Sequence, residues 1–146
     1  MKIISYNVNG IRAAMQKGFV EWVATENPDI ICLQELKAEI DQVDISGLAE
    51  LGYQIHWHSA QKKGYSGVGI FSKLTPSHVE VGCGIEKYDV EGRVLRLDFP
   101  DFSIGTVELS RRPDFSEDLF SILSADTALS PAVLLSSIRP FIMSIM

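Results

Sequence analysis

Apolar residues along the first hundred positions fall into short runs that are separated by glycine, proline and polar turns. Residues 2–8 and 29–34 are nearly continuous apolar runs, as in strands covered on both faces. Between them, Phe19, Val20, Trp22 and Val23 form an apolar stripe that predicts a helix over 16–25, ended by Asn27-Pro28. Strand, helix and strand at this spacing predict a βαβ unit with two parallel strands.

The pattern changes further along the chain. A short helix is predicted over 44–51, and strands are predicted over 52–59, 68–72, 78–81, 94–99 and 102–104, separated by Gly, Pro and Asp turns. Another helix is predicted over 115–123. A change from βαβ to antiparallel hairpins is typical of a layered α/β sandwich rather than a doubly wound sheet. We therefore expect that sandwich.

Polar side chains follow the two predicted parallel strands. Tyr6-Asn7-Val8-Asn9-Gly10 lies at the end of the first, and Gln34-Glu35-Leu36-Lys37 lies at the end of the second. The carboxyl ends of neighbouring strands are where open α/β sheets build ligand crevices. Amide and carboxylate oxygens in such a crevice suit a hard cation such as Mg²⁺. The same residues are also typical of a turn and of a solvated Glu, so the spacing alone leaves both interpretations open.

Composition sets limits on size and partners. A chain of 146 residues with 46% hydrophobic residues suits one packed domain. The net charge of −6 counts mildly against binding to nucleic acid, because phosphate contacts normally come from a basic surface. A local basic rim of Arg12, Lys37, Lys62 and Lys63 is compatible with a negative total.

The cysteines and the chain ends bear on location. Cys32 and Cys83 lack metal-binding spacing, and Cys32 lies in an apolar run, as expected for a reduced core thiol of a cytosolic protein. The first residues lack the long apolar segment of a signal peptide. The apolar stretch over 119–146 is interrupted too often to cross a bilayer. We therefore expect a cytoplasmic protein without membrane contact.

Four segments, in order along the chain, resemble the exodeoxyribonuclease III and apurinic endonuclease branch of the endonuclease/exonuclease/phosphatase superfamily. They are residues 4–13, 28–37, 63–70 and 91–94. The resemblance covers about residues 1–104 and implies a sandwich of two sheets flanked by helices, in agreement with the pattern. It also implies a Mg²⁺-dependent DNA repair phosphodiesterase, with Mn²⁺ as an alternative cation. Such an enzyme cleaves double-stranded DNA at abasic sites or removes 3′-terminal nucleotides, with no obligate protein partner.

The resemblance assigns roles to individual residues. Asn7 and Glu35 are expected to hold the metal ion. Asn9 stands where many relatives carry Asp, so it adds an oxygen without a charge. The residues expected at the nucleic acid are Arg12, Lys37 and Tyr65. Those expected to support the site are Asn9 and Arg93, and we expect Arg93 to pair internally.

Several of these residues also have structural interpretations. Asn7 suits a turn, and Arg12 and Lys37 suit surface ion pairs. Tyr65, in the loop Gly64-Tyr65-Ser66-Gly67, suits a packing role as well as an approach to nucleic acid. His56 and His58 share one face of a predicted strand, but a third ligand with zinc-like geometry is absent from the sequence, so we favour a structural role for both.

Beyond Ile104 the resemblance ends. Residues 105–146, here called the tail, lack the tyrosine, Asp-x-Asn and Asp-His motifs that the family would place there. The catalytic acid and base are therefore unassigned, and we expect a catalytically inactive chain, as a truncated or frameshifted gene would produce. A short paralogue stays open. We also expect aggregation, because the apolar faces of Val68, Ile70, Val94 and Leu97 would lose their partner layer.

Two other function classes stay open. The chain can be a non-catalytic fragment that binds nucleic acid or a protein through an exposed sheet. It can also be a phosphatase or phosphodiesterase that acts on small molecules or lipids. The segments 34–37 and 64–67 favour the nuclease branch over this last class.

Overall fold

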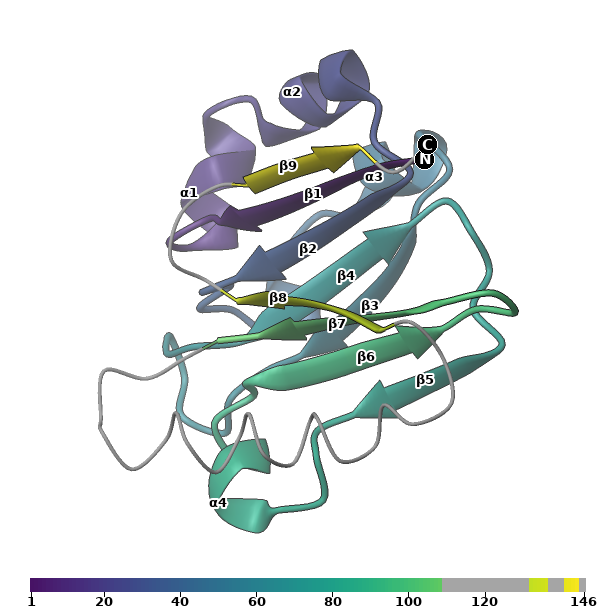
Figure 1. Cartoon of the computed structure of the whole chain (residues 1–146). Helices are drawn as coiled ribbons and strands as arrows, with labels where there is room; N and C mark the ends of the chain where they lie inside the picture. The colour runs from purple at the N-terminus through teal and green to yellow at the C-terminus, as the bar shows by residue number, and fades with distance from the viewer. Residues whose placement is uncertain (109–131, 137–140, 145–146) are drawn as a thin grey trace.

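Two β-sheets face each other in this protein, and helices cover the outer face of one of them (Figure 1). The computed structural model describes residues 1–108, 132–136 and 141–144. One sheet has the strand order β3-β4-β2-β1-β9, here called sheet A, and the other has the order β5-β6-β7-β8, here called sheet B. This arrangement confirms the predicted layered α/β sandwich.

The described strands are β1 (Lys2–Asn7), β2 (Ile30–Gln34), β3 (Gln54–His58), β4 (Val68–Ser72), β5 (His78–Val81), β6 (Val94–Asp98), β7 (Ser103–Val107), β8 (Ala132–Ser136) and β9 (Phe141–Ser144). The described helices are α1 (Ile11–Gln16), α2 (Phe19–Glu26), α3 (Ser46–Glu50), α4 (Glu86–Asp89) and the 3₁₀ helix η1 (Ile40–Gln42). Each is too short or too polar to cross a membrane.

The predicted βαβ unit is present. β1 and β2 pair in parallel, from Ile3 opposite Ile30 to Asn7 opposite Gln34. Their carboxyl ends therefore lie side by side at one edge of sheet A. The helices that connect them, α1 and α2, pack on the outer face of that sheet (Figure 1).

The predicted single helix over 16–25 is wrong at its start. Two helices replace it: α1 ends at Gln16 and α2 begins at Phe19. Gly18 between them adopts a left-handed conformation with φ 89°, which breaks the helical path. Residues 11–15, which precede the predicted helix, belong to α1.

Alternation along β1 divides the apolar side chains between two cores. Ile4 faces the helices and joins an outer core with Phe19 and Val23 of α2. Ile3 points the other way, because successive strand residues face opposite sides. It joins an inner core between the sheets, whose buried members are Ile3, Ile30, Cys32, Val68, Ile70, Leu95, Leu97, Phe99 and Ile104.

The expected loss of a partner layer is wrong for the four residues named above. Val68, Ile70 and Leu97 are 0% exposed and Val94 is 3% exposed. The reason is that the first 108 residues already contain strands from both sheets. β6 and β7 supply the layer that covers β2 and β4.

Other strand predictions differ only in their bounds. β4 and β5 match the predicted ranges, whereas β7 continues beyond Ile104 to Val107. Two strands of the tail were not predicted: β8 extends sheet B in parallel with β7, and β9 pairs with β1 in antiparallel orientation. The helix predicted over 115–123 lies outside the described residues.

Candidate metal and phosphate site

Three loops meet at the carboxyl ends of β1 and β2. The segment 35–37 lies in the middle, since Gly10 donates its backbone N–H to the carbonyl of Glu35 and Lys37 donates its own to the carbonyl of Ser66, both at 2.8 Å. Leu36 lies between them, fully buried, and donates its N–H to the carbonyl of Gly67. The segment is therefore held from both sides by main-chain hydrogen bonds.

The backbone of these loops is unusual. Among the described residues, five that are not glycine have positive φ, and four of them lie here: Asn9, Glu35, Lys37 and Ser66, with φ between 46° and 54°. Each such residue costs about 1–3 kcal/mol and persists only where the surroundings hold it in place. Conformations of this kind cluster at functional sites.

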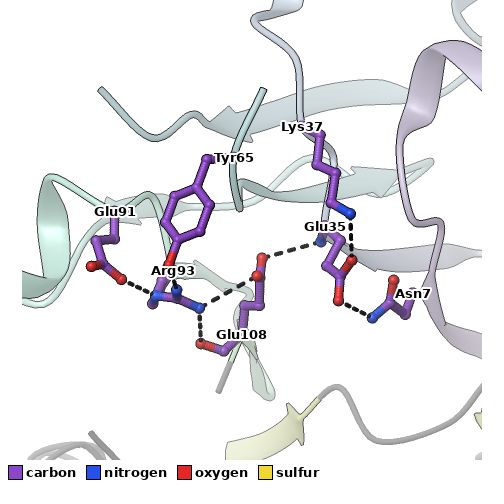
Figure 2. A network of polar contacts seen from close by, with 7 residues as sticks. All are labelled: Asn7, Glu35, Lys37, Tyr65, Glu91, Arg93 and Glu108. Atoms are coloured by element: carbon purple, nitrogen blue, oxygen red, sulfur yellow. Dashed lines mark hydrogen bonds and ion pairs between the residues drawn. The ribbon is translucent and has the colours of Figure 1, made fainter. Parts of the chain in front are cut away.

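The predicted metal residues are in direct contact. Asn7 donates from Nδ2 to Oε1 of Glu35 at 2.9 Å, and its Oδ1 accepts the N–H of Asn9 at 3.0 Å. The ammonium of Lys37 lies 3.0 Å from Oε2 of Glu35 (Figure 2). It also donates to Oδ1 of Asn9 at 2.6 Å. These oxygens already surround a positive charge.

The donor set fits a hard cation. Glu35 offers a carboxylate, and Asn7 and Asn9 offer carboxamide oxygens, which are ligands that Mg²⁺ prefers. In the part of the chain that the structure describes, no three His, Cys, Asp or Glu side chains come together as a metal cluster. A cation here would therefore be held by one carboxylate, amide oxygens and water.

A buried guanidinium lies next to this group. Arg93, at 3% exposure, donates to carboxylate oxygens of Glu91 and Glu108 and to the hydroxyl of Tyr65 (Figure 2). Its guanidinium carbon also lies 5.4 Å from the centre of the Tyr65 ring. Arg93 thus links the loop that carries Tyr65 to the end of β7.

Glu108 connects the guanidinium of Arg93 to the backbone of Glu35. Its Oε2 accepts the backbone N–H of Glu35 at 3.1 Å, and its Oε1 accepts Nη1 of Arg93 at 3.3 Å. Burial raises the pKa of the Glu108 carboxyl above its usual value, and the Arg93 charge opposes that rise. Sequence reasoning missed Glu108, although it follows an apolar strand just as Glu35 does.

The remaining predicted residues lie at different distances from this network. Tyr65 is half-buried, with the ammonium of exposed Lys62 lying 5.2 Å from its ring centre. Arg12 is exposed on α1, outside the network that Figure 2 draws. His58 meets the carbonyl of Val94 at 2.9 Å, which supports the structural interpretation of that residue.

Comparison with known proteins identifies the family to which this chain belongs. Residues 4–135 match the Endonuclease/Exonuclease/phosphatase family. The chain belongs to this family. Its membership in the predicted exodeoxyribonuclease and apurinic endonuclease branch is confirmed by the names of its relatives.

Two relatives of known name show the extent of the match. The exodeoxyribonuclease of Bacillus subtilis is 48% identical over 108 residues, which is 73% of this chain and 42% of that protein. A DNA-(apurinic or apyrimidinic site) endonuclease of Dictyostelium discoideum is 42% identical over 104 residues, covering 71% of this chain and 28% of that protein. The chain thus spans less than half the length of these members of the Endonuclease/Exonuclease/phosphatase family.

A solved structure of the family has the same fold. The 3′ phosphatase NExo from Neisseria, bound to a product DNA hairpin, matches with a TM-score of 0.73 at 29% identity. The match covers 93% of this chain and 56% of that one. The predicted division of the chain at residue 104 stays a prediction.

Proposed function

We propose that this chain carries part of the site of a Mg²⁺-dependent DNA repair phosphodiesterase. Its substrates would be double-stranded DNA with abasic sites or 3′ ends. The names of the two relatives, an exodeoxyribonuclease and an apurinic endonuclease, support this substrate class. A cytoplasmic location is part of the same proposal.

One observation carries the proposal. Asn7 ends β1 and Glu35 directly follows β2, the parallel strand beside it, and their side chains are joined by a 2.9 Å hydrogen bond. The backbone of Glu35 is held in a left-handed conformation. This is the crevice position of α/β sheets. Oxygen ligands so fixed suit a cation that must lie next to a phosphate.

Each residue has a defined part in the proposal. Asn7 and Glu35 would hold Mg²⁺ or Mn²⁺, with Asn9 adding an oxygen. A bound divalent ion would neutralise charge that develops on the phosphoryl oxygens. Arg12, Lys37 and Tyr65 would contact the DNA. Arg93 donates to the Tyr65 hydroxyl at 2.7 Å.

Metal binding is the direct test. We expect weak Mg²⁺ binding, because few of the ion's six ligands come from the protein and water supplies the rest. Calorimetric titration of Mg²⁺ into the wild type and Glu35→Gln should show binding that the substitution removes. Asp44→Asn, an exposed carboxylate on the segment before α3, is the matched control and should bind as the wild type does. Identical isotherms for wild type and Glu35→Gln would contradict the metal assignment.

We also propose that the 146-residue chain has little nuclease activity by itself. The family's acid and base motifs are absent from its tail, and each such group accelerates the reaction by roughly 10²- to 10⁴-fold. An abasic-site duplex incubated with the chain and Mg²⁺ should remain intact. Turnover close to that of the Bacillus subtilis relative would contradict this part of the proposal.

A second function, DNA binding without catalysis, is favoured by Lys37. Its ammonium already satisfies oxygens of Glu35 and Asn9, so the site holds together without a divalent ion. Fluorescence anisotropy of a labelled duplex separates the two functions. DNA affinity that is equal in Mg²⁺ and in EDTA, and that falls steeply with salt, would favour the non-catalytic binder.

A further inference from the structure

Glu108 is the one carboxylate in Figure 2 that contacts the main chain of Glu35. It follows β7, the strand of sheet B next to β6, whereas Glu35 follows β2 of sheet A. The contact therefore joins the two sheets at the edge where the cation site lies. Glu108 is only 7% exposed, so water does not replace this contact readily.

The main chain at Glu35 needs such a contact. Its φ of 54° is a left-handed conformation that costs a side chain with a Cβ about 1–3 kcal/mol. Its carbonyl is held by the N–H of Gly10, and its own N–H is held by Oε2 of Glu108. The direction of the Glu35 side chain depends on this backbone conformation.

Glu108 is itself fixed from the other side. Arg93 donates from Nη1 to both the side-chain Oε1 and the backbone carbonyl of Glu108, each at 3.3 Å. Glu108 in turn donates its backbone N–H to the carbonyl of Arg93 at 2.9 Å. Glu91 accepts from the Nε of the same guanidinium. Both carboxylates therefore pair with Arg93, whereas Glu108 also accepts the backbone N–H of Glu35.

We propose that Glu108 is a positioning residue that fixes the main chain of Glu35 and thereby aims the Glu35 carboxylate at the cation. The proposal rests on the proposed function, in which Glu35 holds that cation. The competing explanation is that Glu108 serves only as a charge partner for buried Arg93.

Two substitutions of Glu108 separate the effect of its side-chain length from the effect of its negative charge. Glu108→Gln keeps the length of the side chain and one oxygen that can accept the Glu35 N–H, but it loses the charge and the second oxygen that accepts from Arg93. Glu108→Asp keeps the charge for Arg93, but its shorter side chain retracts from Glu35. Glu91→Gln is the matched control, since it removes the same charge from the same guanidinium.

Mn²⁺ titration of the full chain, followed by the electron paramagnetic resonance of free Mn²⁺, is the measurement. Mutation of a residue that hydrogen-bonds to a metal ligand and orients it typically lowers metal affinity by roughly 10- to 100-fold. We expect Glu108→Asp to weaken Mn²⁺ binding by about tenfold or more, and Glu108→Gln and Glu91→Gln to stay within about threefold of wild type. Near-UV circular dichroism identifies any variant that fails to fold.

The outcomes are distinct. Weaker binding in Glu108→Gln with wild-type binding in Glu108→Asp would show that charge alone matters and would overturn the proposal. Wild-type affinity in both variants would overturn it as well. If Glu108→Asp does not fold, weak binding by folded Glu108→Gln alone would also overturn it, and retained binding would support it. Glu35→Gln serves as the reference: if it binds Mn²⁺ like the wild type, the proposed function fails instead.

Discussion

At the scale of single residues, the site is built around a cation that the protein itself supplies. Lys37 places its ammonium on oxygens of Glu35 and Asn9, two of the residues proposed to receive a divalent ion. Lysine and metal would therefore compete for the same oxygens. The sequence suggested a phosphate contact or a surface ion pair for Lys37, and the structure places it in an ion pair within the site.

Removal of Lys37 should strengthen metal binding. Both side chains of the pair are about one-third exposed, at 36% and 32%, so the pair is screened by water. Exposed pairs of this kind contribute roughly 0.2–1 kcal/mol, which corresponds to a gain in Mg²⁺ affinity of about 1.4- to fivefold for Lys37→Met. Calorimetric titration measures it. Lys87→Met on α4 removes an equal charge and should leave the affinity unchanged; unchanged or weaker binding by Lys37→Met would show that the two cations do not compete.

At the scale of elements, glycines decide how closely the segments approach. Gly92 joins α4 to β6 with φ +60°, and a Cβ built there would lie 2.4 Å from backbone atoms of Ser59 and Ala60. This close approach brings Glu91 and Arg93 alongside the end of β3. The geometry explains why glycine stands between the two residues whose side chains form an ion pair.

Gly92→Ala should therefore destabilise the fold more than a left-handed conformation alone does. The conformation costs an Ala about 1–2 kcal/mol, and the backbone overlap adds roughly 1–3 kcal/mol. Gly84→Ala is the control, because Gly84 also has positive φ, at +81°, but a Cβ there meets nothing within 4 Å. Urea denaturation of both variants measures the difference. Equal losses of unfolding free energy would mean that the chain relaxes around residue 92 at little cost.

Sequence reasoning found the elements whose signals are local. The parallel pair β1 and β2, and the oxygen-bearing residues that follow them, come from apolar runs and their ends. The break at Gly18 was missed because a single glycine within an apolar stripe does not by itself end a helix. Glu108 was missed because its partner Glu35 lies 73 residues earlier, and only the packing of sheet B on sheet A brings them together.

At the scale of the whole molecule, the two sheets act as one structure because polar and apolar contacts cross between them. Gln34, at 1% exposure, donates from Nε2 to the hydroxyls of Ser5 and Thr106, so it joins β1, β2 and β7 inside the sandwich. The inner core lies on the same interface. Exposure of this interface to solvent therefore requires the sheets to separate.

Cys32 reports on that separation. It is 0% exposed in the inner core, and burial raises the pKa of its thiol far above the usual value, so the reactive thiolate is scarce in the folded state. We expect Cys32 to react with Ellman's reagent only when the chain unfolds globally, with labelling that follows the loss of near-UV circular dichroism as urea increases. The experiment uses Cys83→Ser, which removes the half-buried second thiol that lies outside the inner core. Fast labelling of Cys32 in native buffer would mean that the sheets separate without global unfolding, and that the sandwich is not a single cooperative unit.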